Sequence, residues 1–592
     1  MKKSVICLIT LVVLIGVVVG ILVITGCSKE EPKEPSVEKF AASDTLEVPV
    51  FEITENDKGE SEVKEVSKLV RGSSVNIFPT PVVINETNYV QIEEPKPEDS
   101  KEEAPSHYLL ETSLADAKDA TVLEKERFVR TPVTVYKTAD APDIASFFPK
   151  GTPLTVTGFS GLNEDGTVEM YQVSDGTNEG YVYSKYLVST QEEADAVYTE
   201  YYDLNKDKIY DSELYCGLPS DLDYYPYDKT FNTDKKLPDE ARTLYVGYGA
   251  IDYIEEYIDC AKDIGANALV IDIKDGGLAY HSEVAKEYCP TAYKSSFHEN
   301  KSYREGIKKV QDAGIWAIGR IVVFNDEHFA KDHPDECIYE NGVNQEWPTA
   351  YSRLAWEYNV KLAQEAVQEM GFDEIQFDYV RFPEDTFFMS RDGKADFKNT
   401  YKEEKSQAIQ NFCFYAADQI HKAGAYFSVD VFGECSNGYV TAYGQYWPAI
   451  SMIVDAISSM PYVDHFGRDV DTWTDYYTTV YNWAEKAKKA QDITVNPASA
   501  RTWLTCYDVP YWDPVITADS AFLGGQVQAL WDAGIGEGGF ITWNAASNVN
   551  TYYNVGDAFR RDYTKKETKK DETAGEETGE ETNDQEEGQE EN

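Results

Sequence analysis

The chain has 592 residues, which is too long for a single hydrophobic core, and its length favours three or four domains. Its formal net charge is −51, from 105 acidic and 54 basic residues. Such a polyanion offers no basic surface to release counterions from phosphates, which argues against nucleic acid as a partner. The 42 tyrosines and 10 tryptophans suit either half-buried aromatic surfaces or stacking faces for sugars.

The N-terminus carries a targeting pattern. Lys2 and Lys3 precede an apolar run from Val5 to Ile24, which ends at Ile24-Thr25-Gly26-Cys27. This ending resembles a bacterial lipobox. The resemblance implies that residues 1–26 are a signal peptide, that Cys27 is lipidated, and that the protein is extracytoplasmic and lipid-anchored to the bacterial cell membrane. An uncleaved single-span anchor is the alternative, because the apolar run is long enough to cross a bilayer.

Two polar stretches and the spacing of the cysteines predict further features of the chain. Residues 27–44 are rich in Lys, Glu, Pro and Ser, which predicts a disordered tether, and residues 564–592 predict a disordered acidic tail. Apart from Cys7 and Cys27, the cysteines are widely spaced and form no CxxC motif. Neither a disulfide framework nor a zinc site is indicated, and we expect no metal and no cofactor.

An internal repeat lies between the tether and residue 190. Residues 45–116 and 127–190 each contain short blocks of alternating apolar and polar residues, which predicts two small all-β domains. The second copy ends in Gly180-Tyr181-Val182-Tyr183-Ser184-Lys185-Tyr186-Leu187, which resembles the closing signature of bacterial SH3-like domains, and the first copy is a weaker match. The resemblance implies either binding of cell-wall peptides or glycans, or a spacer. Residues 191–240 form a tyrosine-rich connector.

The pattern changes after Arg242. Short apolar runs alternate with longer segments of helical period, which is typical of a parallel α/β fold. Over residues 241–563 eight such runs predict a (β/α)8 TIM barrel with insertions. A doubly wound open sheet is the alternative, but no glycine-rich phosphate loop follows the first run. The eight predicted strands are residues 244–249, 268–274, 316–324, 374–382, 426–432, 456–460, 500–506 and 538–543.

In such barrels the chemistry lies at the carboxyl ends of the strands. Period two places Asp378 and Asp430 on the inner faces of the fourth and fifth strands. A buried carboxylate costs free energy unless it is paired, and Arg320 and Arg381 are the expected partners. Two interpretations stay open at this point: a catalytic or ligand-binding site, and a structural charge network.

Two carboxyl groups across one cavity are what glycoside hydrolysis requires. One acid protonates the leaving oxygen, while one carboxylate attacks or stabilises the oxocarbenium-like centre. A barrel that binds glycans without cleaving them, with the SH3-like modules as the working part, is the alternative. A metal-dependent polysaccharide deacetylase would need an Asp-Asp pair and a His-x-x-x-His arrangement, which the sequence does not contain.

Residues 244–559 resemble a bacterial family described as a putative glycosyl hydrolase domain, which is related to α-amylase-type barrels. The most specific stretch is Gly371-Phe372-Asp373-Glu374-Ile375-Gln376-Phe377-Asp378-Tyr379-Val380-Arg381-Phe382-Pro383. Residues 270–275, 320–324, 430–433 and 444–445 support it. The resemblance implies that Asp378 is the nucleophile and that Asp430 or Glu434 is the acid/base.

Two strand endings depart from the family pattern. The sixth strand ends in Ser459-Met460-Pro461-Tyr462-Val463-Asp464-His465-Phe466, where the family has roughly Pro-Met-Val-Tyr-Pro-Ser-His-Tyr. The seventh ends in Trp503-Leu504-Thr505-Cys506, where the family usually has Trp-Leu-Gln-Asp. The missing Gln-Asp pair removes substrate contacts at this strand unless Asp508 compensates.

The sequence thus predicts a surface lipoprotein that hydrolyses a cell-wall or extracellular polysaccharide. Its predicted partners are a polysaccharide or peptidoglycan, and the membrane through the lipid on Cys27. The residues predicted to orient the acids are Asp272, Lys274, Arg320 and Arg381. The residues predicted to form the sugar-facing wall are Tyr462, His465, Trp503 and Trp543.

Overall fold

The computed structural model describes residues 35–43, 47–56, 59, 61–94, 106–122, 124–163, 167–197, 215–467, 470–510, 513 and 515–565. The predicted signal peptide, Cys27 and nearly all of the predicted tail lie outside these residues. No helix within the described residues is long and apolar enough to span a membrane. The chain divides into two compact units, Met1–Glu126 with Thr155–Val173, and Arg127–Leu154 with Ser174–Asn592.

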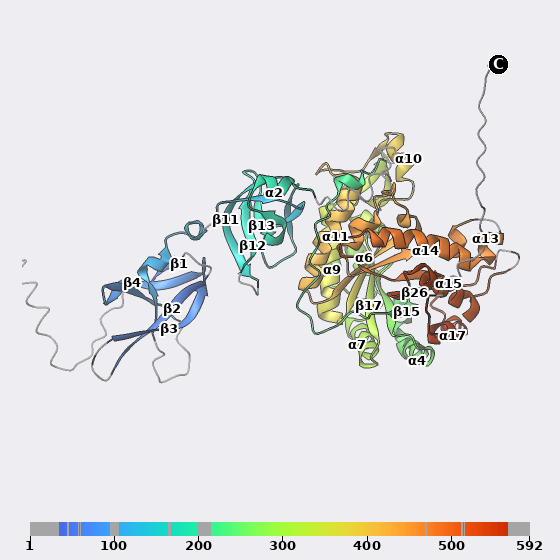
Figure 1. The fold of residues 1–592 in the computed structure, drawn as a ribbon, viewed down its shortest axis with the longest axis horizontal. Helices are drawn as coiled ribbons and strands as arrows, with labels where there is room; N and C mark the ends of the chain where they lie inside the picture. Colours follow the sequence, from blue (N-terminus) through green and yellow to red (C-terminus); the bar gives the residue numbers. More distant parts are fainter. Residues whose placement is uncertain are drawn as a thin grey trace, which may run out of the picture. The chain divides into compact units, whose positions relative to one another are not determined.

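Figure 1 shows the first β-sheet near the N-terminus, in blue. It has seven strands in the order β3-β2-β6-β5-β4-β1-β7. Its core contains Val48, Val50, Val90 and Leu109, which alternate with more exposed residues along their strands. The strands are β1 (Val37–Ala41), β2 (Glu47–Glu55), β3 (Ser61–Val70), β4 (Ser74–Ile84), β5 (Thr87–Ile92), β6 (His107–Leu110) and β7 (Leu114–Ala115).

Strand β1 corrects the predicted tether. Residues 37–41 fall within the stretch assigned to a disordered tether, yet they pair antiparallel with both β4 and β7. Ala41 at the end of the strand is fully buried in the core. A segment rich in Lys and Glu is held in this sheet because its backbone groups have hydrogen-bond partners on both sides.

The second sheet repeats the strand order of the first. Its order is β10-β9-β13-β12-β11-β8-β14, and each strand takes the place of the strand seven numbers lower in the first sheet. Two all-β modules with one topology confirm the all-β prediction, while the SH3-like identity stays a prediction. The strands are β8 (Glu126–Val129), β9 (Val133–Tyr136), β10 (Ile144–Phe148), β11 (Pro153–Leu162), β12 (Val168–Ser174), β13 (Glu179–Tyr183) and β14 (Leu187–Val188).

The C-terminal part contains a parallel sheet in the order β24-β23-β22-β20-β17-β16-β15-β26-β25. Its two end strands, β24 and β25, are consecutive in the chain and separated only by Arg501, whose backbone N–H donates to Ile457 on β23. The sheet therefore returns on itself as a barrel. The strands are β15 (Ala241–Val246), β16 (Ala268–Lys274), β17 (Trp316–Val322), β20 (Glu374–Asp378), β22 (Tyr426–Phe432), β23 (Ala456–Met460), β24 (Ser499–Ala500), β25 (Thr502–Thr505) and β26 (Gly539–Trp543).

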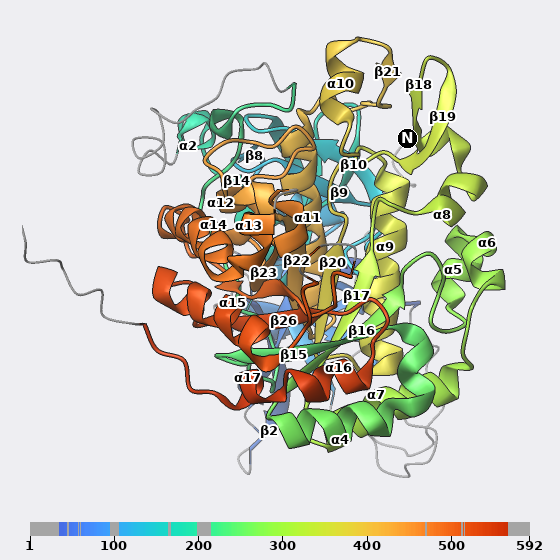
Figure 2. The same ribbon diagram turned by 90° about the vertical axis from the view of Figure 1, so that its right-hand side faces the viewer.

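Helices surround this barrel (Figure 2). Ser352 and Asp519 cap the first turns of α9 and α15 with their side-chain oxygens. Gly265 ends α4 with φ of 86°, a left-handed conformation that glycine adopts without strain. The main helices are α4 (Ile254–Ile264), α7 (Asn300–Asp312), α9 (Arg353–Glu365), α11 (Lys405–Lys422), α14 (Tyr476–Asp492) and α15 (Ser520–Ala533).

An inserted three-stranded sheet, in the order β19-β18-β21, was not predicted. It consists of β18 (Cys337–Glu340), β19 (Val343–Pro348) and β21 (Ala395–Asp396). The first two strands form a hairpin before α9, and the two-residue β21 joins it from the segment after β20. Strands this short carry too little hydrophobic periodicity to be recognised in the sequence.

Within the second unit, Asp418 on α11 joins the end of the second β-module to the barrel. Its carboxylate accepts hydrogen bonds from Lys185 Nζ at 2.6 Å, Tyr186 hydroxyl at 2.8 Å and Tyr227 hydroxyl at 2.8 Å. Both tyrosines and Asp418 are buried. Lys185 and Tyr186 belong to the stretch that resembles the SH3-like signature, so this stretch contacts the barrel of its own chain.

We expect Asp418→Ala to lower the free energy of unfolding of the second unit by about 3 kcal/mol, because it leaves two buried hydroxyls without their acceptor. Urea denaturation followed by fluorescence measures this. The control is Asp492→Ala, which removes an exposed carboxylate paired with Lys488 on α14 and should change stability by less than about 0.5 kcal/mol. Equal losses in the two variants would contradict the assignment of Asp418 as the joint.

Candidate active site

Four neighbouring strands place charged side chains inside the barrel. Arg320 on β17 is paired in the sheet with Asp272 on β16 and with Gln376 on β20. Gln376 is paired in turn with Ser428 on β22. Since alternate residues share a face, Asp378 and Asp430, two residues further along β20 and β22, lie on the same inner face. The sheet register thus brings carboxylates of three strands around one guanidinium.

Arg320 is the centre of this charge network. Its Nη2 lies 2.7 Å from Asp378 Oδ2, and its Nη1 lies 2.7 Å from Asp272 Oδ1 and 3.0 Å from Asp275 Oδ2. Its Nε donates to Asp378 Oδ2 at 3.2 Å. The nearby carboxylates Asp272, Asp378 and Asp275 hold the pKa of Arg320 well above its usual range, against the opposing effect of burial. The guanidinium is therefore a permanent buried cation.

Asp430 has the most unusual surroundings in the network. It is fully buried, and its Oδ1 accepts a hydrogen bond from Trp503 Nε1 at 2.8 Å. Its Oδ2 has no hydrogen-bond partner among the described residues and lies 3.9 Å from Arg320 Nε. Burial, and then the charge of Asp378, raise the pKa of Asp430 well above its usual range. Both effects favour the protonated form of the Asp430 carboxyl group.

The two carboxylates are close enough to act on one bond. Asp378 Oδ2 and Asp430 Oδ2 lie 3.2 Å and 3.9 Å from the same atom, Arg320 Nε. Their separation cannot exceed the sum of these distances, which is below the roughly 9.5 Å that inverting glycosidases allow between their two acids.

The turn after β20 fixes Asp378. Tyr379 has φ of 54°, a left-handed conformation that costs a non-glycine residue roughly 1–2 kcal/mol. This turn directs the backbone N–H of Tyr379 onto Asp378 Oδ1, at 2.6 Å. Both oxygens of Asp378 are therefore held, one by a backbone N–H and one by Arg320.

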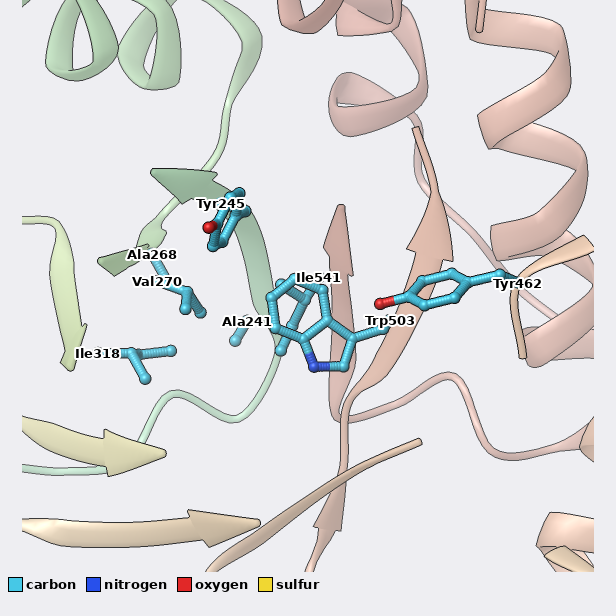
Figure 3. Close-up of a cluster of buried hydrophobic side chains, with 8 residues drawn as sticks. All are labelled: Ala241, Tyr245, Ala268, Val270, Ile318, Tyr462, Trp503 and Ile541. Atoms are coloured by element: carbon cyan, nitrogen blue, oxygen red, sulfur yellow. The ribbon is translucent and has the colours of Figure 1, made fainter. Parts of the chain in front are cut away.

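Aromatic side chains border the network. The hydroxyl of Tyr245 donates to Asp272 Oδ2, and the Tyr245 ring lies 4.7 Å from the ring of Trp543. The Trp543 ring lies 5.6 Å from that of Trp503 and 6.3 Å from that of Tyr462. Burial raises the pKa of the Tyr462 hydroxyl, and so do the charges of Asp378 and Asp430. Tyr245, Tyr462 and Trp503 belong to one buried cluster, which Figure 3 shows.

A second ion pair lies deeper in the barrel. Arg501 Nη1 contacts both oxygens of Glu374, at 2.9 Å and 2.7 Å, and both side chains are fully buried. Ser428 hydroxyl and Trp316 Nε1 also donate to Glu374. With every oxygen of Glu374 occupied, this pair has a structural rather than a chemical character.

Seven of the predicted site residues meet in this network, and the others do not. Lys274 pairs with Asp326 at 2.5 Å, because a bulge between Asp272 and Lys274 interrupts the alternation of β16. Arg381 pairs with Glu384 at 3.1 Å and makes no ion pair with Asp378 in the described structure. The seven residues that meet are Asp272, Arg320, Asp378, Asp430, Tyr462, Trp503 and Trp543.

Three further predicted residues, Asp508, Glu434 and His465, lie outside the network. Asp508 is exposed and accepts a hydrogen bond from the Ala518 backbone N–H, so it fixes a loop and does not replace the missing Gln-Asp pair. Glu434 is carried away from Asp378 by a short 3-10 helix, η10 (Gly433–Ser436), that begins where β22 ends. Glu434 and His465 both line a cleft beside the network.

Two members of the network, Tyr245 and Asp275, were not among the predicted site residues. Tyr245 lies on β15 two residues before Gly247, and a tyrosine near the end of a first barrel strand was a usable signal. Asp275 follows β16, with a partly exposed side chain beside Arg320. Among the described residues no group of three or more His, Cys, Asp or Glu side chains is placed to hold a metal ion.

Comparison with known proteins identifies the family. The sequence pattern of the family described as "Putative glycosyl hydrolase domain" matches residues 244–549, which is more than half of the chain. This chain belongs to that glycosyl hydrolase family. The matched range contains every strand of the barrel except β15, whose first residues precede it. No curated protein matches the chain.

Several solved structures are similar to parts of this family member. A hypothetical protein from Ruminiclostridium thermocellum is 32% identical over 32% of this chain and 97% of its own, with a TM-score of 0.27. The PgaB (BpsB) glycoside hydrolase domain from Bordetella bronchiseptica is 12% identical over 54% of this chain and 99% of its own, with a TM-score of 0.39. The C-terminal domain of a putative chitinase from Desulfitobacterium hafniense is 11% identical over 54% and 98%, with a TM-score of 0.37. All three TM-scores are below 0.5, and no assignment is based on them.

The buried network predicts a pH dependence of stability. Burial raises the pKa of Asp272 to about 6, so the folded protein holds a proton that the unfolded chain loses above about pH 4. The stability that this proton contributes is complete below about pH 4 and is lost as the pH rises through 6. We expect Asp272→Asn to remove up to about 3 kcal/mol of the difference in unfolding free energy between pH 4 and pH 7.

Urea denaturation of both proteins at several pH values tests this expectation. Asp259→Asn on α4, a partly exposed position outside the network, is the control and should keep the pH profile of the wild type. Parallel profiles for the wild type and Asp272→Asn would show that Asp272 is ionised in the folded protein throughout this range.

Proposed function

We propose that this chain is a glycoside hydrolase that cleaves a cell-wall or extracellular polysaccharide with Asp378 and Asp430 as its paired carboxyl groups. One observation carries the proposal: Asp378 is salt-bridged to Arg320, while the neighbouring Asp430 is fully buried and its Oδ2 has no hydrogen-bond partner among the described residues. Burial raises the pKa of Asp430, which favours its protonated form. Membership of a glycosyl hydrolase family supports it.

In this proposal the two acids have different roles. Asp430 donates its proton to the glycosidic oxygen, and the bond from this oxygen to the sugar carbon breaks as the leaving hydroxyl forms. Asp378, held by Arg320 and by the Tyr379 N–H, faces the positive charge that develops at the sugar carbon, either as nucleophile or through water. Trp503 Nε1 and Arg320 then stabilise the carboxylate that Asp430 becomes.

The remaining network residues support these two. Asp272 and Asp275 fix the guanidinium of Arg320 from the opposite side. Tyr462 and Trp543 present rings beside the carboxylates, and such rings stack on the apolar faces of sugars. Lys274, Arg381 and Asp508 have no part in the proposed reaction, because each is bound elsewhere.

A barrel that binds glycans without cleaving them is the second candidate function. One observation favours it: Asp378 is only 4% exposed and Asp430 is not exposed at all. A network this closed would also suit a barrel that uses its charges for stability alone.

We further propose that the protein is a lipoprotein held outside the bacterial membrane by a lipid on Cys27, with two SH3-like modules that lie between the anchor and the barrel. The lipobox-like sequence Ile24-Thr25-Gly26-Cys27 supports the anchor. The shared strand order of the two β-sheets supports a duplicated module. Peptidoglycan or a polysaccharide attached to it is the partner within reach of such an anchor.

We expect Asp378→Asn and Asp430→Asn each to lower kcat by about 10²–10⁴-fold, because each removes one of the paired carboxyl groups. Release of reducing ends from purified cell walls and from extracellular polysaccharide measures this. The control is Asp312→Asn at the exposed end of α7, which should keep wild-type kcat. If the wild type and Asp378→Asn bind glycan equally and neither releases reducing ends, the binding candidate replaces the hydrolase.

The raised pKa of Asp430 predicts an alkaline limb in the pH profile of kcat/KM, where the acid loses its proton. Trp503→Phe removes a hydrogen bond that lowers this pKa, so the limb should move to higher pH. Trp531→Phe on α15, outside the network, is the matched control. A limb that moves to lower pH or stays in place in Trp503→Phe would assign the titration to another group.

A further inference from the structure

A cleft of about 690 Å³ opens at the carboxyl ends of β22 and β23, beside the short helix α13 (Val470–Thr474) and α14. Phe432 and Met460, neighbours across these two strands, form its inner wall. Phe432 is two residues beyond Asp430 on β22, so both side chains lie on one face of the strand. The cleft therefore begins at Phe432, two residues beyond the proposed acid Asp430 on the same face of β22.

Tyr462 connects the cleft to the two carboxylates. Its ring packs edge-on against the ring of His465, which lines the cleft, with the centroids 5.4 Å apart. The same side chain feels the charges of Asp378 and Asp430 at its hydroxyl. Tyr462 also packs against Trp543 of the network, and Asp430 Oδ2 has no hydrogen-bond partner among the described residues.

Glu434 is the best-positioned charge in the cleft. The hydroxyl of Tyr439 donates to its Oε1 at 2.9 Å, and the hydroxyl of Tyr443 donates to its Oε2 at 3.0 Å. Two phenols on opposite oxygens fix the direction of an otherwise exposed carboxylate. Asp471 and Asp475 add negative charge to the lining, and Lys486 donates to Asn437 Oδ1 at 3.3 Å. Negative charge therefore exceeds positive charge among the described lining residues.

We propose that this cleft binds the sugar unit next to the bond to be cleaved, and that Glu434 recognises a positively charged amino group on that sugar. The inference rests on the proposed function, because the glycan must pass from the cleft to Asp378 and Asp430. An ammonium beside a fixed carboxylate makes a charge-assisted hydrogen bond, while a uronate or phosphate would be repelled. Phe432 and Phe466 supply apolar surface for the sugar ring.

This proposal gives Glu434 a binding role in place of the acid role that the family resemblance implies. Both of its oxygens already accept hydrogen bonds from tyrosines, and it is exposed where Asp430 is buried. An exposed, hydrogen-bonded carboxylate suits recognition of a cation, and a buried carboxyl with a raised pKa suits proton donation.

Isothermal titration of the full chain at pH 6 with three tetrasaccharides tests the proposal: glucosamine (cationic), N-acetylglucosamine (neutral) and galacturonate (anionic). Glucosamine tetramer should bind tightest and galacturonate weakest. Glu434→Gln should weaken the glucosamine tetramer about tenfold and the N-acetylglucosamine tetramer less than twofold. The matched control is Glu485→Gln, an exposed glutamate on α14 outside the cleft lining, which should leave all three affinities unchanged.

Two results would overturn the proposal: equal or stronger binding of the galacturonate tetramer, or a Glu434→Gln variant with unchanged affinity for the glucosamine tetramer. Asp378→Asn should keep the binding order of the wild type, since it leaves the cleft intact. Charge-selective binding without turnover in the wild type would contradict the hydrolase and support the cleft. Turnover of a glycan without the charge preference would contradict the cleft alone.

Discussion

The interior of the barrel depends on one guanidinium. Arg320 contacts Asp272 on β16, Asp378 on β20 and Asp275 in the loop after β16. Asp430 on β22 lies 3.9 Å from it. Several carboxylates at this depth would repel one another strongly without a cation, and the folded state could not keep them ionised. The sheet register that pairs Arg320 with Asp272 and Gln376 is therefore also the register that permits the site.

Asp272, Asp275, Asp378 and Asp430 share the one cation Arg320, which cannot neutralise all four of them. As a result, the two proposed catalytic acids differ in how closely they pair with Arg320. Asp378 accepts two hydrogen bonds from Arg320 and is held as its ion-pair partner. Asp430 is more distant and is buried more completely, and its burial and the charge of Asp378 raise its pKa. The deeper pair, Glu374 with Arg501, is matched one to one and has no such asymmetry. The unequal pairing of Asp378 and Asp430 with Arg320 distinguishes the proposed acid, Asp430, from Asp378.

Much of the barrel could be predicted from the sequence, because its strands are buried on both faces and are mostly apolar, with few charged residues. The predicted and observed bounds coincide for β16, β22 and β23. The prediction for the fourth strand ran four residues too far, because the left-handed turn at Tyr379 leaves no trace in hydrophobic periodicity. The same turn explains why Arg381 was placed beside Asp378.

The site residues could be predicted where side chains alternate regularly along a strand. Asp378 and Asp430 lie on such segments, and alternation predicted their inward direction. Asp272 and Arg320 were predicted from their places near the carboxyl ends of their strands. Lys274 follows a bulge and Glu434 follows a strand end, where a single residue changes which way a side chain points. The choice between Arg320 and Arg381 as the partner of Asp378 needed the register between strands, which one sequence does not contain.

The contacts of Asp418 change where this chain can be divided. Because a helix of the barrel supplies the acceptor for Lys185, Tyr186 and Tyr227, buried polar groups would be exposed on both sides of a cut at residue 241. The shortest fragment with these partners intact begins near Arg127, at the start of the second module. A recombinant barrel that starts at Arg127 keeps these hydrogen bonds, and one that starts at the first barrel strand loses them.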